Sequence, residues 1–541
     1  MHVVRWLVMR LDDWFLTSEE RGNPMTEIDS HQSGDVAWTE GNHVAFHIDG
    51  VSYFTSLAEV ILSLEPQDEI RFTDWRGDAD ERVSGEGTSI VALLANACLR
   101  GVDVRGLLWR SHSDRFAFSS KENRRLAVEV TEAGGEVLLD ERVRRGGSHH
   151  QKMVLIRHPS FLDRDVAFVG GIDLSHGRRD DTDHRGDHQG VKLDPRFGHR
   201  PPWHDVQLEI RGPAVTELDL TFRERWEDPT PLNHAGRLRA MLSRVMSRDR
   251  VARPLPARLG DPPTPGGHAV QVLRTYPSRR PKYPFAPDGE RSVARAFAKA
   301  IKRARSLIYI EDQYFWSVEI ARLLAKTLRR QPGLQVIAVV PRYPDKDGKL
   351  SGPPSRLAQA RALAIVKNAG GERVGIYDIE NEIGTPIYVH AKVCVIDDVW
   401  ATVGSDNLNR RSWTHDSELS CAVIDSELDE RMPLDPGGLG DGSRKFARAL
   451  RLSLWAEHLG RSLDDPELLN LAHSYVLWQE TANELEGWRS SLGEGHRPPS
   501  RIRSHAIDPV SNGSQRWAGL AYRLIFDPDG RPLKLRLRRR F

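Results

Sequence analysis

Three features are scarce in this sequence of 541 residues, and each scarcity excludes a class of protein. Only 3 cysteines occur, widely separated and without metal-ligand spacing, which excludes a disulfide framework and a cysteine metal site. The formal net charge is +1, whereas a dedicated nucleic-acid-binding protein would be clearly basic, so no nucleic-acid partner is expected. No apolar run approaches the roughly 20 residues of a membrane-spanning helix, which predicts a soluble, cytoplasmic protein that contacts membranes only peripherally.

The N-terminal residues lack the features of a targeting signal. The stretch MHVVRWLVMRLDDWFL is short, is interrupted by Arg5, Arg10 and two aspartates, and has no small-residue cleavage site. The stretch that follows, TSEERGNPMTEIDSHQSGD, is polar. We therefore expect residues 1–39 to form a mobile segment.

Strand and helix patterns alternate along most of the remaining chain, which predicts an α/β fold. The same order of elements occurs twice, and each time it ends in a His-x-Lys strand followed by a glycine turn. This repeat of about 200 residues predicts two duplicated halves, each with a central β-sheet flanked by helices. The first half would span residues 40–245, a Pro/Gly/Arg-rich linker residues 246–268, and the second half, with a helical and basic C-terminal extension, residues 269–541.

The second copy of the repeated motif is complete in YVHAKVCVIDDVWATVGSDNLNRRS, which contains His390, Lys392 and Asp397. Its β-branched and apolar residues predict a strand, in which alternate side chains share a face, so His390 and Lys392 point the same way. A histidine beside a lysine packs poorly in a core but suits an oxyanion such as phosphate. By the same rule the first copy pairs His150 with Lys152.

The first copy has Arg157 where the second has its aspartate. Measured from the histidine to the glycine turn, the first copy is six residues longer than the second, 20 against 14. Counted back from that turn, Asp163 occupies the position of Asp397, seven residues before the glycine. Residues 157–162, RHPSFL, then form an insertion that we expect to bulge from the end of the strand, away from the histidine.

Together these motifs resemble the phospholipase D superfamily, and more narrowly its eukaryotic-type phospholipases. The resemblance rests on HHQK, FVGGIDLSHGRRD, PWHDVQLEIRGPA, YIEDQYF, HAKVCVID and GSDNLNRRS, and covers roughly residues 40–425. Two features depart from the family pattern, namely the insertion and Asp312, where the family usually has asparagine. The resemblance implies a bilobal fold in which the two His-x-Lys strands form the active site at the lobe interface.

The resemblance also implies a two-step phosphodiester exchange through a phosphohistidine. It makes His150 the nucleophile and His390 the general acid, which later activates water or an alcohol as a base. Lys152 and Lys392 would hold the phosphate oxygens and stabilise the developing charge, so neither a metal nor another cofactor is expected.

Further site residues follow from the same family pattern. Each histidine needs an acceptor on its other ring nitrogen, and the candidates are Asp205 and Glu418, which open the strands after the two turns. Asn407 would supply an amide donor. The remaining candidates are the turn residues expected to bind substrate, Gly171, Asp173 and Ser405, and the two aspartates expected to close the loops after the motif strands, Asp163 and Asp397.

Three weaker patterns each allow two interpretations. His184 and His188 have metal-like spacing, although the surrounding glycine and aspartate residues favour an ordinary loop. His204 either lines the pocket or is a loop histidine. The tail LKLRLRRRF alternates leucine with basic residues, which fits an edge strand whose basic face is either solvated or in contact with anionic lipid.

The sequence therefore predicts a phospholipase D that hydrolyses phosphatidylcholine-like lipids to phosphatidic acid and the head-group alcohol, and that transfers the phosphatidyl group to primary alcohols. Its partner would be phospholipid at a membrane surface, and a monomer is favoured. The alternatives are a cardiolipin-synthase-like phosphatidyltransferase and another phosphodiesterase or a nuclease of the same superfamily. A non-catalytic lipid-binding relative is disfavoured because both His/Lys pairs are intact.

Overall fold

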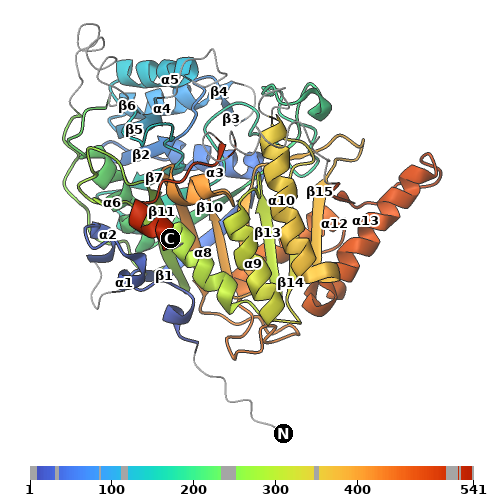
Figure 1. Cartoon of the computed structure of the whole chain (residues 1–541). Helices are drawn as coiled ribbons and strands as arrows, with labels where there is room; N and C mark the ends of the chain where they lie inside the picture. Colours follow the sequence, from blue (N-terminus) through green and yellow to red (C-terminus); the bar gives the residue numbers. More distant parts are fainter. Residues whose placement is uncertain are drawn as a thin grey trace.

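A computed structural model of the chain describes residues 9–30, 36–84, 87–110, 120–232, 252–345, 352–506, 522, 526–538 and 541. These residues form an α/β structure around one mixed sheet of 16 strands with helices packed against it (Figure 1). The predicted α/β fold with a sheet in each half is confirmed. The two sheets join edge to edge, so that one continuous sheet runs through both halves.

The order of the strands is the same in both halves when each is followed from its outer edge to the junction. The first half contributes β6 (Glu136–Asp140), β5 (Asp103–Trp109), β2 (Glu69–Asp74), β7 (Met153–Arg157), β8 (Val166–Gly170), β10 (Val206–Arg211) and β1 (Thr39–Ile48). The second half contributes β15 (Val374–Ile379), β14 (Gln335–Val339), β13 (Leu307–Asp312), β17 (Lys392–Ile396), β18 (Trp400–Gly404), β19 (Glu418–Asp425) and β11 (His268–Tyr276), with β20 (Ile502–Ser504) added outside β15. In each half the three corresponding outer strands are parallel and the rest antiparallel, which confirms the duplication.

The two halves meet where β1 pairs with β11, at Thr39 with Val270 and at Asn42 with His268. Short strands complete the set: β12 (Glu290–Arg291) pairs with β11, β9 (Trp203–His204) with β16 (Tyr388–Val389), and β3 (Arg82–Ser84) with β4 (Thr88–Ser89). The pair of β9 and β16 is a second link between the halves, because β9 belongs to the first and β16 to the second.

The helices divide between three hydrophobic cores. The first-half core contains α3 (Gly50–Leu62), α4 (Ile90–Leu99) and α5 (Ser120–Glu132), and its counterpart contains α8 (Ser292–Arg303), α9 (Val318–Arg330) and α10 (Gly352–Gly370). The third core spans both halves and contains α6 (Ala214–Trp226), α12 (Lys445–Leu459) and α13 (Ser474–Ser490). In β13, Ile308 packs in the second-half core and Tyr309 in the shared core, because successive side chains of a strand point to opposite faces.

Residues 9–30 are packed against both halves, so the prediction of a mobile segment over residues 1–39 is wrong for them. Trp14 and Phe15 are 0% exposed and lie in the second-half core. The Leu16 backbone N–H donates to Gln271 Oε1 (2.9 Å), and its carbonyl accepts from Gln271 Nε2 (2.8 Å).

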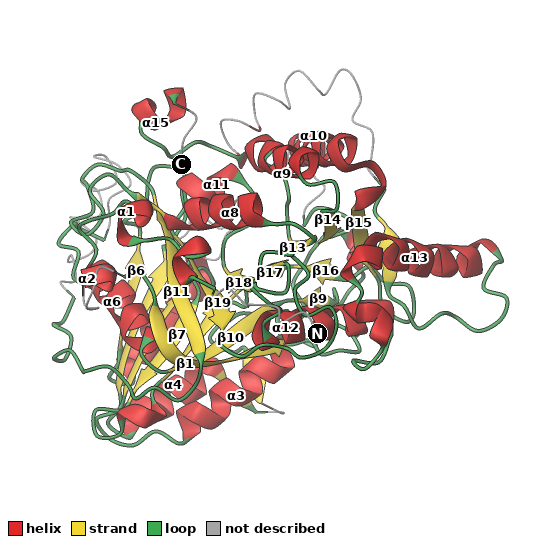
Figure 2. Cartoon of the chain, turned by 90° about the horizontal axis from the view of Figure 1, so that it is seen from below, coloured by secondary structure: helices red, strands yellow, loops and turns green. Residues whose placement is uncertain are grey.

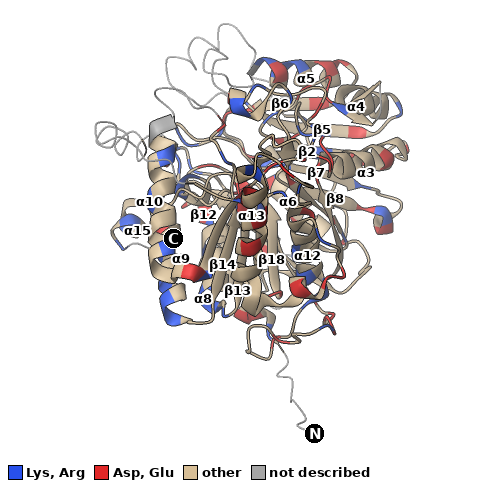
Figure 3. Cartoon of the chain, turned by 90° about the vertical axis from the view of Figure 1, so that its right-hand side faces the viewer, with Lys and Arg blue, Asp and Glu red and all other residues tan. Residues whose placement is uncertain are grey.

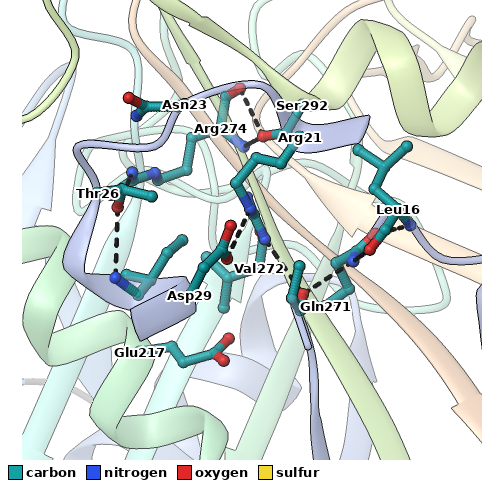
Figure 4. A network of polar contacts seen from close by, with 12 residues as sticks. Leu16, Arg21, Asn23, Thr26, Asp29, Glu217, Gln271, Val272, Arg274 and Ser292 are labelled. Carbon is teal, nitrogen blue, oxygen red and sulfur yellow. Dashed lines mark hydrogen bonds and ion pairs between the residues drawn. The ribbon is translucent and has the colours of Figure 1, made fainter. Parts of the chain in front are cut away.

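Two buried arginines tie this segment to both halves (Figure 4). Arg21, which ends α1 (Ser18–Arg21), pairs with Asp29 of α2 (Glu27–Ser30) at 2.8 Å and with Glu290 of β12 at 3.1 Å. Arg274 of β11 pairs with Glu290 and with Glu224 of α6, each at 2.6 Å. Buried cations need such partners to offset their desolvation, so the N-terminal segment, the first half and the second half share one charged network.

The C-terminal tail is helical, and the predicted edge strand is wrong. In α15 (Leu533–Leu537) the backbone N–H groups of Leu535 and Arg536 donate to the carbonyl of Pro532, so these hydrogen bonds close locally instead of with a neighbouring strand. The linker residues 252–267 contain neither helix nor strand. None of the helices in the described part of the chain has the length and apolar character needed to cross a membrane.

Candidate active site

The two motif strands begin at one cavity between the halves. The backbone N–H of His150, just before β7, donates to the carbonyl of Ser417 (2.8 Å). The backbone N–H of His390, just before β17, donates to the carbonyl of His204 (2.8 Å). Each histidine is therefore held by the segment that precedes a strand of the opposite half, as predicted for strands that meet at the lobe interface.

The cavity has a volume of about 740 Å³ and is lined by residues of both halves. That volume is typical of sites that enclose a small ligand. The lining includes seven aromatic residues, Trp75, Trp109, Trp203, Tyr314, Trp316, Tyr388 and Phe526. It also includes the predicted site residues His150, Asp173, His390, Asn407 and Glu418.

The first histidine pairs with a carboxylate from the second half. His150 Nδ1 lies 2.8 Å from Glu418 Oε2, as predicted, and Ser405 Oγ donates to the same carboxyl oxygen at 2.5 Å. Burial, reinforced by Lys152, lowers the pKa of His150 well below its usual value. Burial also raises the pKa of Glu418 to about 8.

The second histidine pairs with a carboxylate from the first half. His390 Nδ1 lies 2.6 Å from Asp205 Oδ2, as predicted, and the ring of Trp203 packs against the imidazole with centroids 4.9 Å apart. Burial, reinforced by Lys392, lowers the pKa of His390 well below its usual value, and burial raises that of Asp205. In both pairs Nδ1 is engaged, which leaves Nε2 as the nitrogen able to act on a ligand.

The two motif lysines lie buried beneath the histidines. Lys152 Nζ lies 3.3 Å from Asp173 Oδ1, and Lys392 Nζ lies 3.4 Å from Gln313 Oε1. Each ammonium also donates to the backbone carbonyl of the histidine two residues earlier. Burial lowers the pKa of Lys392 to about 8.

An aspartate ends the equivalent strand of each half and holds the glycine turn. Asp74 Oδ2 of β2 accepts the backbone N–H of Leu174 (2.8 Å), and Asp312 Oδ2 of β13 accepts that of Leu408 (2.7 Å). Asp312 therefore has a structural counterpart in the first half, which the matched repeats FTDW and IEDQ could have revealed. In the first turn, Gly171 is required, because an added Cβ would lie 2.0 Å from Asp205 Oδ1.

The loops after the motif strands differ, and the predicted equivalence of Asp163 and Asp397 is wrong. The buried Asp397 accepts backbone N–H groups of residues 305–307, each at 2.8 Å. Asp163 is exposed in a 3₁₀ turn, and Asp165 closes the first loop, pairing with Arg157 (2.6 Å). The strand pairing ends at equivalent pairs, Ile156 with Val166 and Ile396 with Trp400, so all six extra residues lie in the loop. Counting back from the glycine cannot identify which residue of that longer loop turns inward.

The insertion lies at the end of β7 away from His150, as predicted, but its first residue is part of the core. Arg157 is 0% exposed, and besides Asp165 it contacts Asp219 of α6 (3.5 Å). Only the tip is exposed, with Phe161 at 52%.

Sequence reasoning missed Arg178, which lies in the wall of the cavity. Its guanidinium donates to Asp173 Oδ2 (3.2 Å) and lies 3.9 Å from the centroid of Trp203. Asp173 therefore lies between Lys152 and Arg178. Although burial opposes it, these two cations hold the pKa of Asp173 below its usual value. The only signal was the pair of arginines in HGRRD, directly after the first turn.

A second polar cluster lies behind the second histidine pair. Asp49, His184, His204 and Glu457 bring ligand-type atoms within 4.8 Å of one another. Such a set could hold a divalent cation, and the same side chains also bond one another, with His184 Nε2 2.9 Å from Glu457 and His204 Nδ1 3.0 Å from Asp49. His188 is exposed and outside the cluster, so the spacing of His184 and His188 does not mark a site.

His204 fits neither of its two predicted settings. It lies in β9, is 0% exposed, and its Nε2 bonds Glu311 at 2.8 Å. Its carbonyl positions His390, and the next residue is Asp205. We therefore describe His204 as part of the support behind the second pair.

Comparison with known proteins gives two family models and a group of plant relatives. The model described as Phospholipase D matches residues 86–321, and the one described as Cardiolipin synthase, PLD-like domain matches residues 297–432. Phospholipase D beta 2 of Arabidopsis thaliana is 28% identical over 424 residues, 59% of this chain and 44% of the relative. Phospholipase D gamma 3 of the same plant is 26% identical over 519 residues, 74% of this chain and 59% of the relative. The matches thus span only about half the length of these relatives.

Among solved structures, phosphatidylserine synthase from Haemophilus influenzae Rd KW20 is similar in part. Its TM-score is 0.48 at 14% sequence identity, and the match covers 71% of this chain and 82% of that chain.

Proposed function

Because the chain belongs to the phospholipase D superfamily, whose enzymes act on phosphodiester bonds, we propose that it is a phospholipase D. It would hydrolyse phosphatidylcholine-like lipids to phosphatidic acid and the head-group alcohol. The observation that carries the proposal is the pair of histidines at one cavity, each with Nδ1 bonded to a carboxylate of the opposite half.

In the first step, His150 Nε2 attacks phosphorus and the bond to the head-group oxygen breaks. The lowered pKa of His150 keeps it neutral and nucleophilic. His390 donates the proton that the leaving alkoxide needs. The bound phosphodiester carries a negative charge that compensates the two lysines, so binding raises the pKa of His390 and allows it to carry that proton.

In the second step, His390, now neutral, removes a proton from water as the water oxygen attacks phosphorus. The phosphorus–nitrogen bond to His150 breaks, which releases phosphatidic acid and restores the starting proton count. A primary alcohol can take the place of water, and the product is then a phosphatidyl alcohol. Lys152 and Lys392 would stabilise the charge on the non-bridging oxygens in both steps.

The aromatic lining supports a choline-type head group. A quaternary ammonium binds favourably over aromatic faces, and the cavity presents four tryptophan side chains and two tyrosine side chains. The acidic residues Asp345 and Asp416 also line it. A cationic head group would therefore meet aromatic faces, while its phosphate would bind Lys152 and Lys392.

The test is to incubate the purified chain with phosphatidylcholine vesicles and ethanol. We expect phosphatidic acid and phosphatidylethanol, both absent with His150→Asn and with His390→Asn. The matched control is His188→Asn, which alters an exposed histidine outside the cavity and should keep full activity. Cleavage of bis(p-nitrophenyl) phosphate or DNA, with phosphatidylcholine untouched, would contradict the proposal and favour another phosphodiesterase or a nuclease.

A second candidate function is supported by the cardiolipin-synthase family model over residues 297–432. The same phosphohistidine would pass its phosphatidyl group to the hydroxyl of another lipid instead of to water. Phosphatidylglycerol offered as the sole lipid distinguishes the two. Cardiolipin as the main product would favour the transferase, whereas phosphatidic acid and glycerol favour the phospholipase.

A further inference from the structure

The C-terminal helix α15 presents two leucines to solvent. Leu533 is 71% exposed and Leu537 is 77% exposed, and their spacing of four residues places them on one face of the helix. Lys534 and Arg538 are exposed beside them, one residue further along in each case. The helix therefore shows an apolar row flanked by a basic row.

Both ends of this tail are held against the body of the protein. Arg531, before the helix, is 3% exposed, pairs with Glu319 at 3.0 Å and lies 5.0 Å from the ring centroid of Phe541. Phe541, after the helix, packs against Trp413 with ring centroids 5.4 Å apart, and its carbonyl accepts from Arg295 Nε (3.2 Å). The leucines are thus presented by an anchored element, not by a frayed end.

The tail leaves the body at the mouth of the active-site cavity. Phe526 and Pro528 line that cavity, together with Arg145. The backbone N–H of Gly530 donates to Thr414 Oγ1 in α11 (Arg410–Thr414; 3.0 Å), and the carbonyl of Gly530 accepts from Arg144 Nη1 (2.9 Å). The helix begins three residues later, and Figure 2 shows it standing off the body near α11 and α8.

We propose that α15 docks the enzyme on an anionic phospholipid surface. Leu533 and Leu537 enter the boundary between head groups and acyl chains, while Lys534 and Arg538 pair with lipid phosphates. Figure 3 shows basic residues on α15, whereas α13 carries acidic residues, so charge favours the α15 side of the molecule facing the membrane. Arg536 takes no part, because it turns back and donates to the carbonyl of Arg531 (2.7 Å).

The biological sense of this docking rests on the proposed function. Phosphatidic acid is anionic, whereas phosphatidylcholine carries no net charge. Hydrolysis would therefore raise the negative charge of the surface on which the enzyme works. The docking helix would hold the enzyme longer on membranes that it has already begun to hydrolyse.

Co-sedimentation of the full chain with vesicles tests the docking. Wild-type protein should bind phosphatidylcholine vesicles weakly and vesicles containing 30 mol% phosphatidic acid on the order of tenfold more tightly, with the difference reduced at high salt. The double variants Leu533→Asp/Leu537→Asp and Lys534→Glu/Arg538→Glu should each lose about tenfold of that binding. The control is Ile383→Asp/Leu492→Asp, which changes two side chains that are 87% and 95% exposed outside the tail.

Equal binding of wild-type protein to both vesicle types, or unchanged binding by both tail variants, would overturn the docking proposal. Thermal melting of each variant checks that it is folded. Hydrolysis of a short-chain, monomeric phosphatidylcholine checks the active site separately, and it should be unchanged in the tail variants. Vesicle binding that depends on α15, in a protein without any lipid hydrolysis, would overturn the proposed function and leave the docking intact.

Discussion

The two halves of the molecule place the same backbone elements around the cavity but contribute different side chains to it. Each histidine is held by a backbone carbonyl and a carboxylate that precede or open a strand of the other half. The side chains at matching positions differ between the first and second halves: Asp205 against Glu418, Gly171 against Ser405, and Asp173 against Asn407.

These differences give the two histidines unequal surroundings. The side chain of His150 is 15% exposed and that of His390 is 7% exposed. Trp203 packs against His390 with the rings tilted by 38° and centroids 4.9 Å apart, whereas Trp75 approaches His150 edge-on at 6.2 Å. A repeated frame therefore allows two chemically identical residues to take different roles, with the more open histidine suited to attack.

The largest expected loss of activity comes from replacing either histidine, and a substrate with a good leaving group distinguishes their two roles. His150→Asn and His390→Asn should each lower kcat/KM for phosphatidylcholine by about 10⁴-fold or more, since each removes a group that acts directly on the reacting atoms. A substrate with a p-nitrophenolate leaving group needs no acid, so His390→Asn should release one equivalent of nitrophenol in a burst. The measurement is stopped-flow absorbance. A burst from His150→Asn instead would make His390 the nucleophile and His150 the general acid.

The lysines come next, because in the proposed mechanism they bind the phosphate oxygens instead of exchanging protons. Lys152→Met and Lys392→Met should each lower kcat by about 10²–10³-fold, with melting temperatures close to that of the wild type. Isothermal titration with inorganic phosphate should show weakened binding in both variants. Full phosphate affinity in either variant would contradict its role as an oxyanion ligand.

Exchanging Gly171 and Ser405, which occupy matching turn positions, tests directly whether the two halves differ in their tolerance of change. Gly171→Ser should lower activity by about 10²-fold, because the added Cβ displaces Asp205 and thereby misplaces His390. Ser405→Gly removes one hydrogen bond to Glu418 and should cost only about tenfold. The comparison of the two kcat values is the readout. Equal losses would show that the two turns tolerate change alike.

The dependence of activity on pH should reveal the loss of the positive charge on Lys392. Its pKa is lowered to about 8, so its positive charge is present below pH 8 and is lost as the pH rises through that value. We expect kcat/KM to fall above about pH 8, and kcat to fall at a higher pH, because the bound anion raises the pKa of the lysine. Lys392→Arg keeps its charge and should remove this limb. If kcat/KM of that variant still falls above about pH 8, the ionisation of another group is responsible.

The smallest effect on activity should come from the insertion. Deleting the exposed tip, residues 159–161, should leave kcat/KM within about twofold, because it lies at the end of β7 away from the histidine. Arg157→Ala should leave kcat equally unaffected but lower the free energy of unfolding by about 3 kcal/mol, since it strands the buried Asp165. Urea denaturation measures the second effect. Lost activity in the folded tip deletion would make the insertion part of the site.

The parts of this site that local patterns predict are those defined along one strand. Strand parity placed His150 and Lys152 together, and the family pattern indicated Asp205 and Glu418, which open the strands after the two turns, as the carboxylate partners. What the sequence could not show depends on distant residues: Trp14 and Arg21 are buried by segments more than 200 positions away. Asp163 failed for a related reason, because spacing along the chain does not reveal which residue of a longer loop turns inward.

The exchange of carboxylates between the halves also sets when this chain can act. A nascent chain that has emerged as far as the end of the linker, residue 268, already contains His150, Lys152 and Asp205, but Glu418 lies in β19, 150 residues further on. Neither histidine has its orienting carboxylate and its partner histidine until the second half is synthesised and folded. The complete site therefore forms late in translation, and a truncated product ending in the linker would lack it.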